Sequence, residues 1–127
     1  MTGIDSEPAH LPQVDAFSWW TRGSDVVFTT QVPIKPDGSF ELGATGDQMA
    51  QVFNNLDLTL SEADLGRADI RQVIVYLTRM TDLEEVNVSW STYFGSVRPN
   101  RAIIGASELA VPGMTVEAVV YASGRSS

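Results

Sequence analysis

Two segments of the sequence place apolar residues at helical spacing, and they constrain the fold more than any other feature. The first segment follows Thr45-Gly-Asp-Gln48, which has the spacing of a capping box with Thr45 as the N-cap. The pattern predicts a helix from Thr45 to about Ser61. A second such box, Thr81-Asp-Leu-Glu84, opens a helix that Gly95 ends. The apolar stripes are Met49, Val52, Phe53, Leu56 and Leu60 in the first helix and Leu83, Val86, Trp90 and Phe94 in the second.

The segments around these helices are rich in β-branched and aromatic residues, which predicts strands. They cover residues 16–21, 26–34, 69–78, 101–107 and 114–122. The first two strands form a hairpin, and a turn at Pro112-Gly113 joins the last two. The order ββαβαββ predicts an α+β domain of two layers, in which two helices cover one face of a mixed sheet.

The second face of this sheet needs a cover of its own. Strand side chains alternate between the two faces of a sheet, so the apolar strand residues cannot all contact two helices. Trp19, Phe28, Ile74 and Tyr76 are examples. We expect the uncovered face to pack against other copies of the chain.

Length and charge narrow the class of protein. The 127 residues predict a single domain, 1–127, with a loose leader over 1–15 and a frayed tail over 123–127. The net charge is −8, and the basic residues form no cluster in the sequence. An acidic chain of this kind repels phosphate backbones, so no nucleic-acid partner is expected.

The set of reactive side chains excludes several chemistries. The chain has no cysteine, which excludes disulfides and thiolate catalysis, and His10 is its single histidine, which excludes a multi-histidine metal site. No apolar run reaches the roughly 20 residues that span a bilayer, and the first residues lack the features of a signal peptide. We expect a cytoplasmic protein without a membrane partner.

Two charged residues lie in or beside apolar strands. Arg101 follows a Pro-Asn turn signal at the head of one predicted strand, and Glu117 interrupts the apolar run of another. A guanidinium can hold a substrate carboxylate through two hydrogen bonds, and a glutamate can move a proton or position a water. The pair predicts a small substrate with a carboxylate. Alternatively, Arg101 pairs with a carboxylate across a subunit interface, and Glu117 binds a backbone amide or an arginine.

Several segments have an order and spacing that is specific when they are taken together. They are residues 46–56, 69–77 and 83–94, the run Arg98-Pro-Asn-Arg101, the run Gln31-Val-Pro-Ile-Lys-Pro36, and Pro112-Gly-Met-Thr-Val-Glu-Ala118. With these segments, residues 16–122 resemble the Rid family, which is also called YjgF or reactive intermediate deaminase.

The resemblance implies a homotrimer of chorismate-mutase-like subunits, with ligand clefts between neighbouring subunits. It implies hydrolysis of reactive enamines or imines, such as 2-aminoacrylate, to 2-oxo acids and ammonia, without a cofactor or metal. The family's carboxylate-binding arginine falls on Arg101, its water-activating glutamate on Glu117 and its helix asparagine on Asn87. Since Asn87 lies within the apolar stripe of the second helix, we expect it to be hydrogen-bonded inside the protein.

Several positions depart from the family pattern. Thr29-Thr30 replaces Ser-Gly, Phe17 replaces a tyrosine, and Ala102-Ile103 replaces a small or polar pair. Trp19 and Trp20 stand where smaller or polar residues are usual. We expect Phe17, Thr29 and Ile103 to contact the substrate in a tighter or more apolar pocket. Two alternatives remain. One is an enzyme specific to a larger imine, enamine or enol of specialised metabolism, and the other is a ligand-binding trimer without catalysis.

Overall fold

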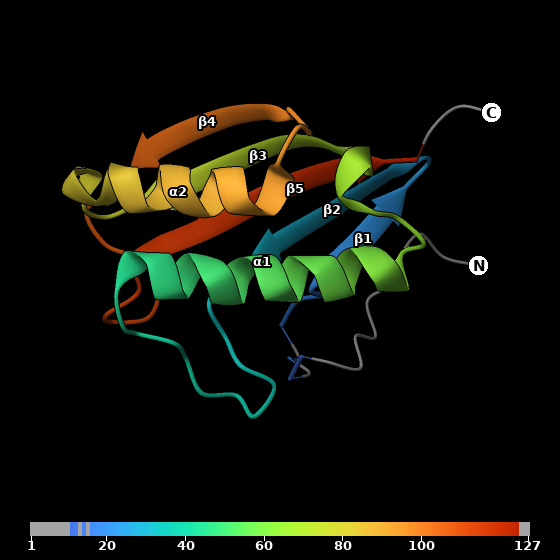
Figure 1. Cartoon of the computed structure of the whole chain (residues 1–127). Coiled ribbons are helices and arrows are strands. Elements are labelled where there is room, and N and C mark those ends of the chain that lie inside the picture. The colour runs from blue at the N-terminus through green and yellow to red at the C-terminus, as the bar shows by residue number, and fades with distance from the viewer. Residues whose placement is uncertain (1–10, 13, 15, 125–127) are drawn as a thin grey trace.

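The computed structural model describes residues 11, 12, 14 and 16–124, and the elements follow the predicted order (Figure 1). The strands are β1 (Trp20–Gly23), β2 (Val26–Gln31), β3 (Ile70–Leu77), β4 (Asn100–Gly105) and β5 (Val116–Ser123). The helices are α1 (Thr45–Glu62) and α2 (Leu83–Phe94). Two short 3₁₀ helices complete the set: η1 (Arg67–Asp69) leads into β3, and η2 (Met80–Asp82) leads into α2. Over the described residues the sheet has the order β1-β2-β5-β3-β4, with β3 and β4 parallel and the other neighbours antiparallel.

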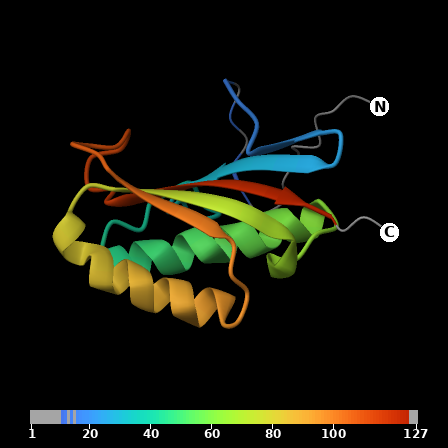
Figure 2. The ribbon, with the colours of Figure 1, turned by 90° about the horizontal axis from the view of Figure 1, so that it is seen from above.

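Both helices lie on the same face of the sheet (Figure 2). The predicted apolar stripes of α1 and α2 pack against the inner side of β3 and β5 and form the main core. Met49, Leu56, Val73 and Val116 are among its fully buried members. The predicted α+β architecture of two layers around a mixed sheet is therefore confirmed.

Both predicted capping boxes are wrong, although both helices form where they were expected. The N-cap of α1 is Ala44, and Thr45 is the first helical residue. The Thr45 hydroxyl lies 2.7 Å from both Asp82 Oδ2 and Thr115 Oγ1. The N-cap of α2 is Asp82, so the Thr81 box does not cap that helix. At the start of α1, the Gly46 N–H instead donates to Glu85 Oε1 of α2 at 2.9 Å.

The strands direct alternate side chains toward the helices and toward an uncovered side, which we call the open face. In β5, Val116 and Ala118 are buried in the core, which places Glu117 on the open face. Phe28 and Ile104 are 42% and 44% exposed there. The apolar side chains of the open face are Phe28, Ile74, Tyr76, Ala102, Ile104, Val119 and Tyr121.

The two neighbouring tryptophans at the start of β1, Trp19 just before the strand and Trp20 as its first residue, are buried in different clusters. Trp19 is buried in a small second cluster that includes Leu11 from the predicted leader. Trp20 is buried on the helix side, where its indole N–H donates to Glu62 at 3.2 Å. His10, most of the leader and the last tail residues lie outside the described residues. No helix in the described part of the chain is long and apolar enough to cross a bilayer.

Candidate active site

Arg101 lies near the start of the edge strand β4 and points toward α2. Its Nη1 donates a hydrogen bond to Asn87 Oδ1 at 3.0 Å, and its Cζ lies 5.0 Å from the centre of the Trp90 ring. The side chain is exposed, and no carboxylate of a described residue forms an ion pair with it. The guanidinium is therefore held in place while its positive charge is left for a ligand.

Two other arginines show the contrast. Arg67 donates from Nε and Nη2 to the two carboxylate oxygens of Asp57, at 3.0 and 2.7 Å. Arg79 pairs with Asp82 at 3.0 Å. The charges of these two arginines are neutralised within the chain.

Asn87 is hydrogen-bonded as expected, but not inside the protein. It is partly exposed, and the partner of its side-chain oxygen is Arg101 at the surface between α2 and β4. The position of Asn87 beside the apolar stripe, rather than within it, explains the difference. The structure thus brings two of the predicted site residues together.

Glu117 lies on the open face, half-buried, between the core positions Val116 and Ala118. No described residue forms a hydrogen bond or an ion pair with its side chain. Burial raises the pKa of the Glu117 carboxyl above its ordinary value, because the charged form loses solvation. A carboxyl group with a raised pKa is better matched to proton transfer near neutral pH than an ordinary glutamate.

A single chain does not bring Arg101 and Glu117 together. Tyr76 of β3 pairs with Glu117 on one side and with Ile104 on the other, so Arg101 is three residues, or about 10 Å, further along β4. The two side chains also point to opposite faces, because Arg101 contacts α2 and Glu117 lies on the open face. Each chain therefore presents two separate halves of the predicted site.

Thr29 points into the protein and its hydroxyl is already occupied. The residue is 5% exposed, its Oγ1 donates to the Trp19 carbonyl at 2.7 Å, and the same oxygen accepts a bond from Gln31 Nε2 at 2.9 Å. Its neighbour Thr30 is exposed on the open face, opposite Val119 of β5. Strand alternation could have identified Thr30 as the outward residue, since Gln31 and Thr29 share the buried face.

Phe17 and Ile103 have different surroundings. Phe17 is 55% exposed and packs edge-on against Trp19, with ring centres 5.2 Å apart. Ile103 packs against the main core on the helix side of β4, the same side as Arg101. Phe17 is therefore accessible to a ligand, whereas Ile103 is partly buried in the core.

Near Thr30 the open face has a shallow hollow of about 250 Å³. Two aromatic rings of its lining, Phe28 and Tyr121, pack edge-on with centres 5.5 Å apart. Glu117, Val119 and Tyr121 follow one another on the open face of β5, so the hollow begins about 7 Å from Glu117 along the strand.

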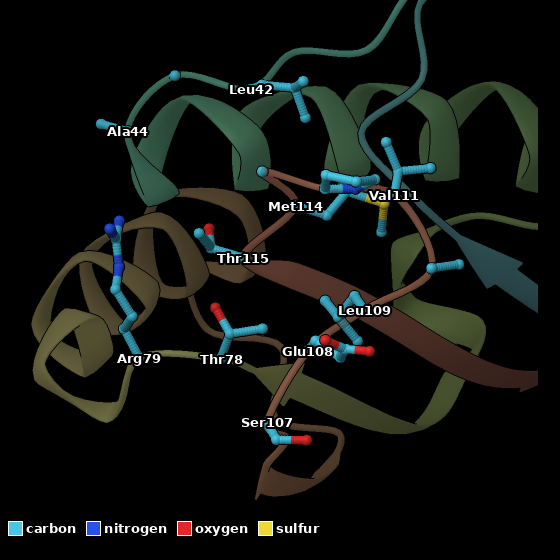
Figure 3. Close-up of a pocket in the computed structure, with 14 residues that line it drawn as sticks. Leu42, Ala44, Thr78, Arg79, Ser107, Glu108, Leu109, Val111, Met114 and Thr115 are labelled. Atoms are coloured by element: carbon cyan, nitrogen blue, oxygen red, sulfur yellow. The ribbon is translucent and has the colours of Figure 1, made fainter.

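Figure 3 shows a larger cavity, of about 710 Å³. Its lining follows the ends of β3 and β4, whereas Arg101 is near the start of β4. The loop between β4 and β5 and the residues before α1 form its walls. Arg79 and Glu108 line it, and Arg79 is already paired with Asp82. Neither Arg101 nor Glu117 lines this cavity. Among the described residues, no three histidine, cysteine or acidic side chains are grouped to hold a metal.

The structure defines a two-layer α+β protein with an exposed arginine and a half-buried glutamate on opposite faces of its sheet. The chain belongs to the family described as Endoribonuclease L-PSP, whose family model matches residues 9–123.

Relatives confirm the resemblance to the Rid family. A RutC family protein of Aquifex aeolicus is 35% identical over 81 residues, which cover 62% of this chain and just under two thirds, 65%, of that protein. A RutC family protein of Pyrococcus abyssi is 31% identical over 101 residues, which cover 78% of this chain and 80% of that protein. The crystal structure of YyfA from Yersinia pestis, a protein of unknown function of the conserved Rid family, has a TM-score of 0.88 at 24% identity and covers 95% of this chain and 98% of its own.

Proposed function

We propose that this protein hydrolyses reactive enamines or imines derived from amino acids to 2-oxo acids and ammonia. The observation that carries the proposal is the guanidinium of Arg101, which Asn87 fixes through a neutral oxygen and which no described carboxylate neutralises. Such a group suits a substrate carboxylate, because two parallel charge-assisted hydrogen bonds can form.

Glu117 supplies the proton transfers. The imine carbon is attacked by water, which forms a C–O bond, and the Glu117 carboxylate accepts the proton that the water loses. Glu117 passes this proton to nitrogen, which gives a carbinolamine, and the proton of the carbinolamine hydroxyl then follows to nitrogen by the same route. The C–N bond breaks, its electron pair leaves with ammonia, and the carbonyl forms. The substrate is already unstable, so orientation and proton transfer are the main contributions that the protein needs to make.

The site requires two copies of the chain in this proposal. Arg101 with Asn87 comes from the edge of one copy, and Glu117 comes from the open face of its neighbour. The apolar side chains of the open face support such packing, because a stable interface needs a large complementary surface. A cyclic homotrimer closes this arrangement without leaving an uncovered apolar face.

The ligand of a structural relative supports the substrate class. The solved structure of TdcF from E. coli contains bound serine, and its chain has a TM-score of 0.85 to this one at 20% identity. Serine has both a carboxylate and an amino group, and the proposal extends this class of small molecule to the present chain.

The hollow beside the Phe28 and Tyr121 rings favours a second candidate, an enzyme for larger imines. Phe28, Thr30 and Tyr121 line the hollow on the same face as Glu117, and Thr30 stands where the resemblance places a glycine in relatives. A bulky apolar side chain on the substrate could lie there, whereas the product of serine or threonine dehydration would leave the hollow empty.

The test is an assay of imine hydrolysis. Imino acids are generated in situ from a series of amino acids, and the loss of their semicarbazones is followed with and without the protein. We expect acceleration that Arg101→Ala reduces at least about 100-fold in kcat/KM, because two charge-assisted hydrogen bonds are lost. Arg98→Ala removes an exposed arginine three residues earlier and should retain activity.

The same assay separates the alternatives. Faster turnover of imines from leucine or phenylalanine than of 2-aminoacrylate would favour the second candidate. No acceleration of any imine, together with carboxylate binding that depends on Arg101, would contradict the enzymatic proposal and favour a binding protein.

A further inference from the structure

We propose that Trp90 is a positioning residue for Arg101 and that its indole reports whether the carboxylate site is occupied. The inference rests on the proposed function, in which Arg101 binds the substrate carboxylate. It adds a residue that touches no substrate in this scheme and acts through the guanidinium.

The indole is itself fixed, so it can fix the arginine. Trp90 lies on the inner stripe of α2, and its ring packs against Phe94 with ring centres 4.4 Å apart. The guanidinium carbon of Arg101 lies 5.0 Å from the centre of the indole. This distance falls within the range in which a cation is attracted by the face of an aromatic ring.

Both contacts of Arg101 are electrically neutral. The ring attracts the cation through its quadrupole, and the Asn87 amide accepts one hydrogen bond at 3.0 Å. Neither group supplies a counter-charge, so the full charge of the guanidinium remains for an incoming anion.

Arg67 is an arginine of the same protein that contacts both an aromatic ring and a carboxylate. Its guanidinium lies 4.0 Å from the centre of the Tyr93 ring, but Asp57 also binds it through two hydrogen bonds. An arginine that contacts an aromatic ring and a carboxylate is neutralised and serves the structure. An arginine that contacts an aromatic ring and an amide keeps its charge for an anion. The residue type at position 87 decides between these two arrangements, because an aspartate there would supply a carboxylate in place of the amide of Asn87.

Fixing the guanidinium before the substrate arrives should strengthen binding rather than speed the chemical step. An arginine side chain has several rotatable bonds, and their freedom is lost when a ligand is held. If Trp90 removes this freedom beforehand, the gain appears in the Kd of a carboxylate and in KM. The kcat should change little, because Trp90 does not contact the reacting atoms.

The experiment measures the Kd of 2-oxobutanoate, a non-reacting carboxylate of the product class, by calorimetry, together with KM and kcat. We expect Trp90→Leu to raise Kd and KM by about threefold to tenfold and to leave kcat within about twofold. Trp90→Phe keeps an aromatic face and should restore most of the affinity. Asn87→Asp should weaken binding more than Asn87→Ala, because it adds the counter-charge that Arg67 already has.

Trp20→Leu is the matched control, because Trp20 also lies near an arginine, with Arg22 Cζ 5.7 Å from its ring centre, but on the distant strand β1. We expect this variant to lower the melting temperature and to leave the Kd unchanged. In the wild type, 2-oxobutanoate should change the tryptophan fluorescence, and Trp90→Phe should abolish this change while it still binds the ligand.

The outcomes separate the two proposals. If Arg101→Ala leaves the Kd unchanged, the proposed function fails. If Arg101→Ala weakens binding but Trp90→Leu and Trp90→Phe do not, and the fluorescence change survives in Trp90→Phe, the role of Trp90 is refuted while the proposed function stands. Should Trp90→Leu fail to fold, the Trp90→Phe fluorescence measurement and the Asn87 pair decide the question.

Discussion

Glu117 shows how its position in a strand changes the chemistry of a single side chain. The residue is half-buried on the open face, and burial raises its pKa above the ordinary value of 4.5. A raised pKa means that the folded state binds the proton more tightly than the unfolded state does. The ionised carboxylate therefore destabilises the fold at neutral pH.

Glu117→Gln should stabilise the protein at neutral pH, because the uncharged amide avoids this penalty. The advantage should shrink as the pH falls through the raised pKa and vanish below the ordinary glutamate range, where the wild-type carboxyl is protonated in both states. Urea unfolding at a fixed protein concentration, from neutral to acid pH, measures the difference. The same variant should lose imine hydrolysis. An equal stability difference at every pH would contradict this account of Glu117.

The sequence did not reveal which way single side chains point. Arg101, Asn87 and Glu117 could be chosen from their setting in strands, a helix and a resemblance. Which face each one uses depends on register, and register follows from strand pairing between distant segments. Thr29 illustrates the limit, because its hydroxyl binds the Trp19 carbonyl and Gln31 inside the protein, and Thr30 points outward instead.

Among the elements, α1 and α2 are tied together by one arginine outside both. Arg67 of η1 binds Asp57 of α1 through two hydrogen bonds and donates to the carbonyl of Tyr93 near the end of α2 at 2.6 Å. The Tyr93 hydroxyl also donates to Asp57, at 2.6 Å. Burial opposes ionisation of Asp57, but hydrogen bonds from Arg67 and Tyr93 outweigh it and lower its pKa.

Asp57→Asn should lower the free energy of unfolding by about 1 to 2 kcal/mol at neutral pH, since it weakens the three charge-assisted hydrogen bonds that the carboxylate accepts. A lowered pKa makes this contribution present above the unfolded-state value and lost as the pH falls through the folded-state value, so the deficit should disappear in acid. Urea unfolding measures it. Asp25→Asn makes the same chemical change in the exposed hairpin turn and should alter stability much less. A deficit that persisted in acid would show that the charge of Asp57 is not responsible.

Helices and strands were predictable where the hydrophobic period was long, and their ends were not. The stripe of α1 is buried at every predicted position, and Gly95 ends α2 with a positive φ of 58°. The first capping box failed because Thr45 binds Asp82 and Thr115, which lie far away in the sequence. A local pattern cannot reveal a partner that only the folded chain supplies.

At the scale of the whole molecule, the open face and the separation of Arg101 from Glu117 both bear on how copies of the chain assemble. The face has apolar residues from four strands, and Arg101 and Glu117 lie on opposite faces of the sheet within one chain. The two-layer fold was predictable from the order of elements. The separation of Arg101 from Glu117 was not, because it depends on the face that each strand turns to the helices.

We expect a homotrimer, and light scattering should report three times the chain mass of 13.8 kDa. Arg101→Ala and Glu117→Gln should each be inactive alone but recover activity when subunits are mixed by joint refolding. About a quarter of the clefts in randomly mixed trimers would then receive an intact arginine from one chain and an intact glutamate from the next. Each variant refolded alone is the control. A monomer with full activity, or no recovery in trimers shown to be mixed, would refute the shared site.

The placement of Arg101 and Glu117 on opposite faces also has an evolutionary consequence if copies share the site. After a gene duplication, one copy could lose its arginine and the other its glutamate without loss of all activity, provided that the two still assemble. Selection would then retain both genes, since neither product works alone. Two residues that face apart in one sheet would in this way open a direct route from a self-assembling enzyme to a pair of interdependent paralogues.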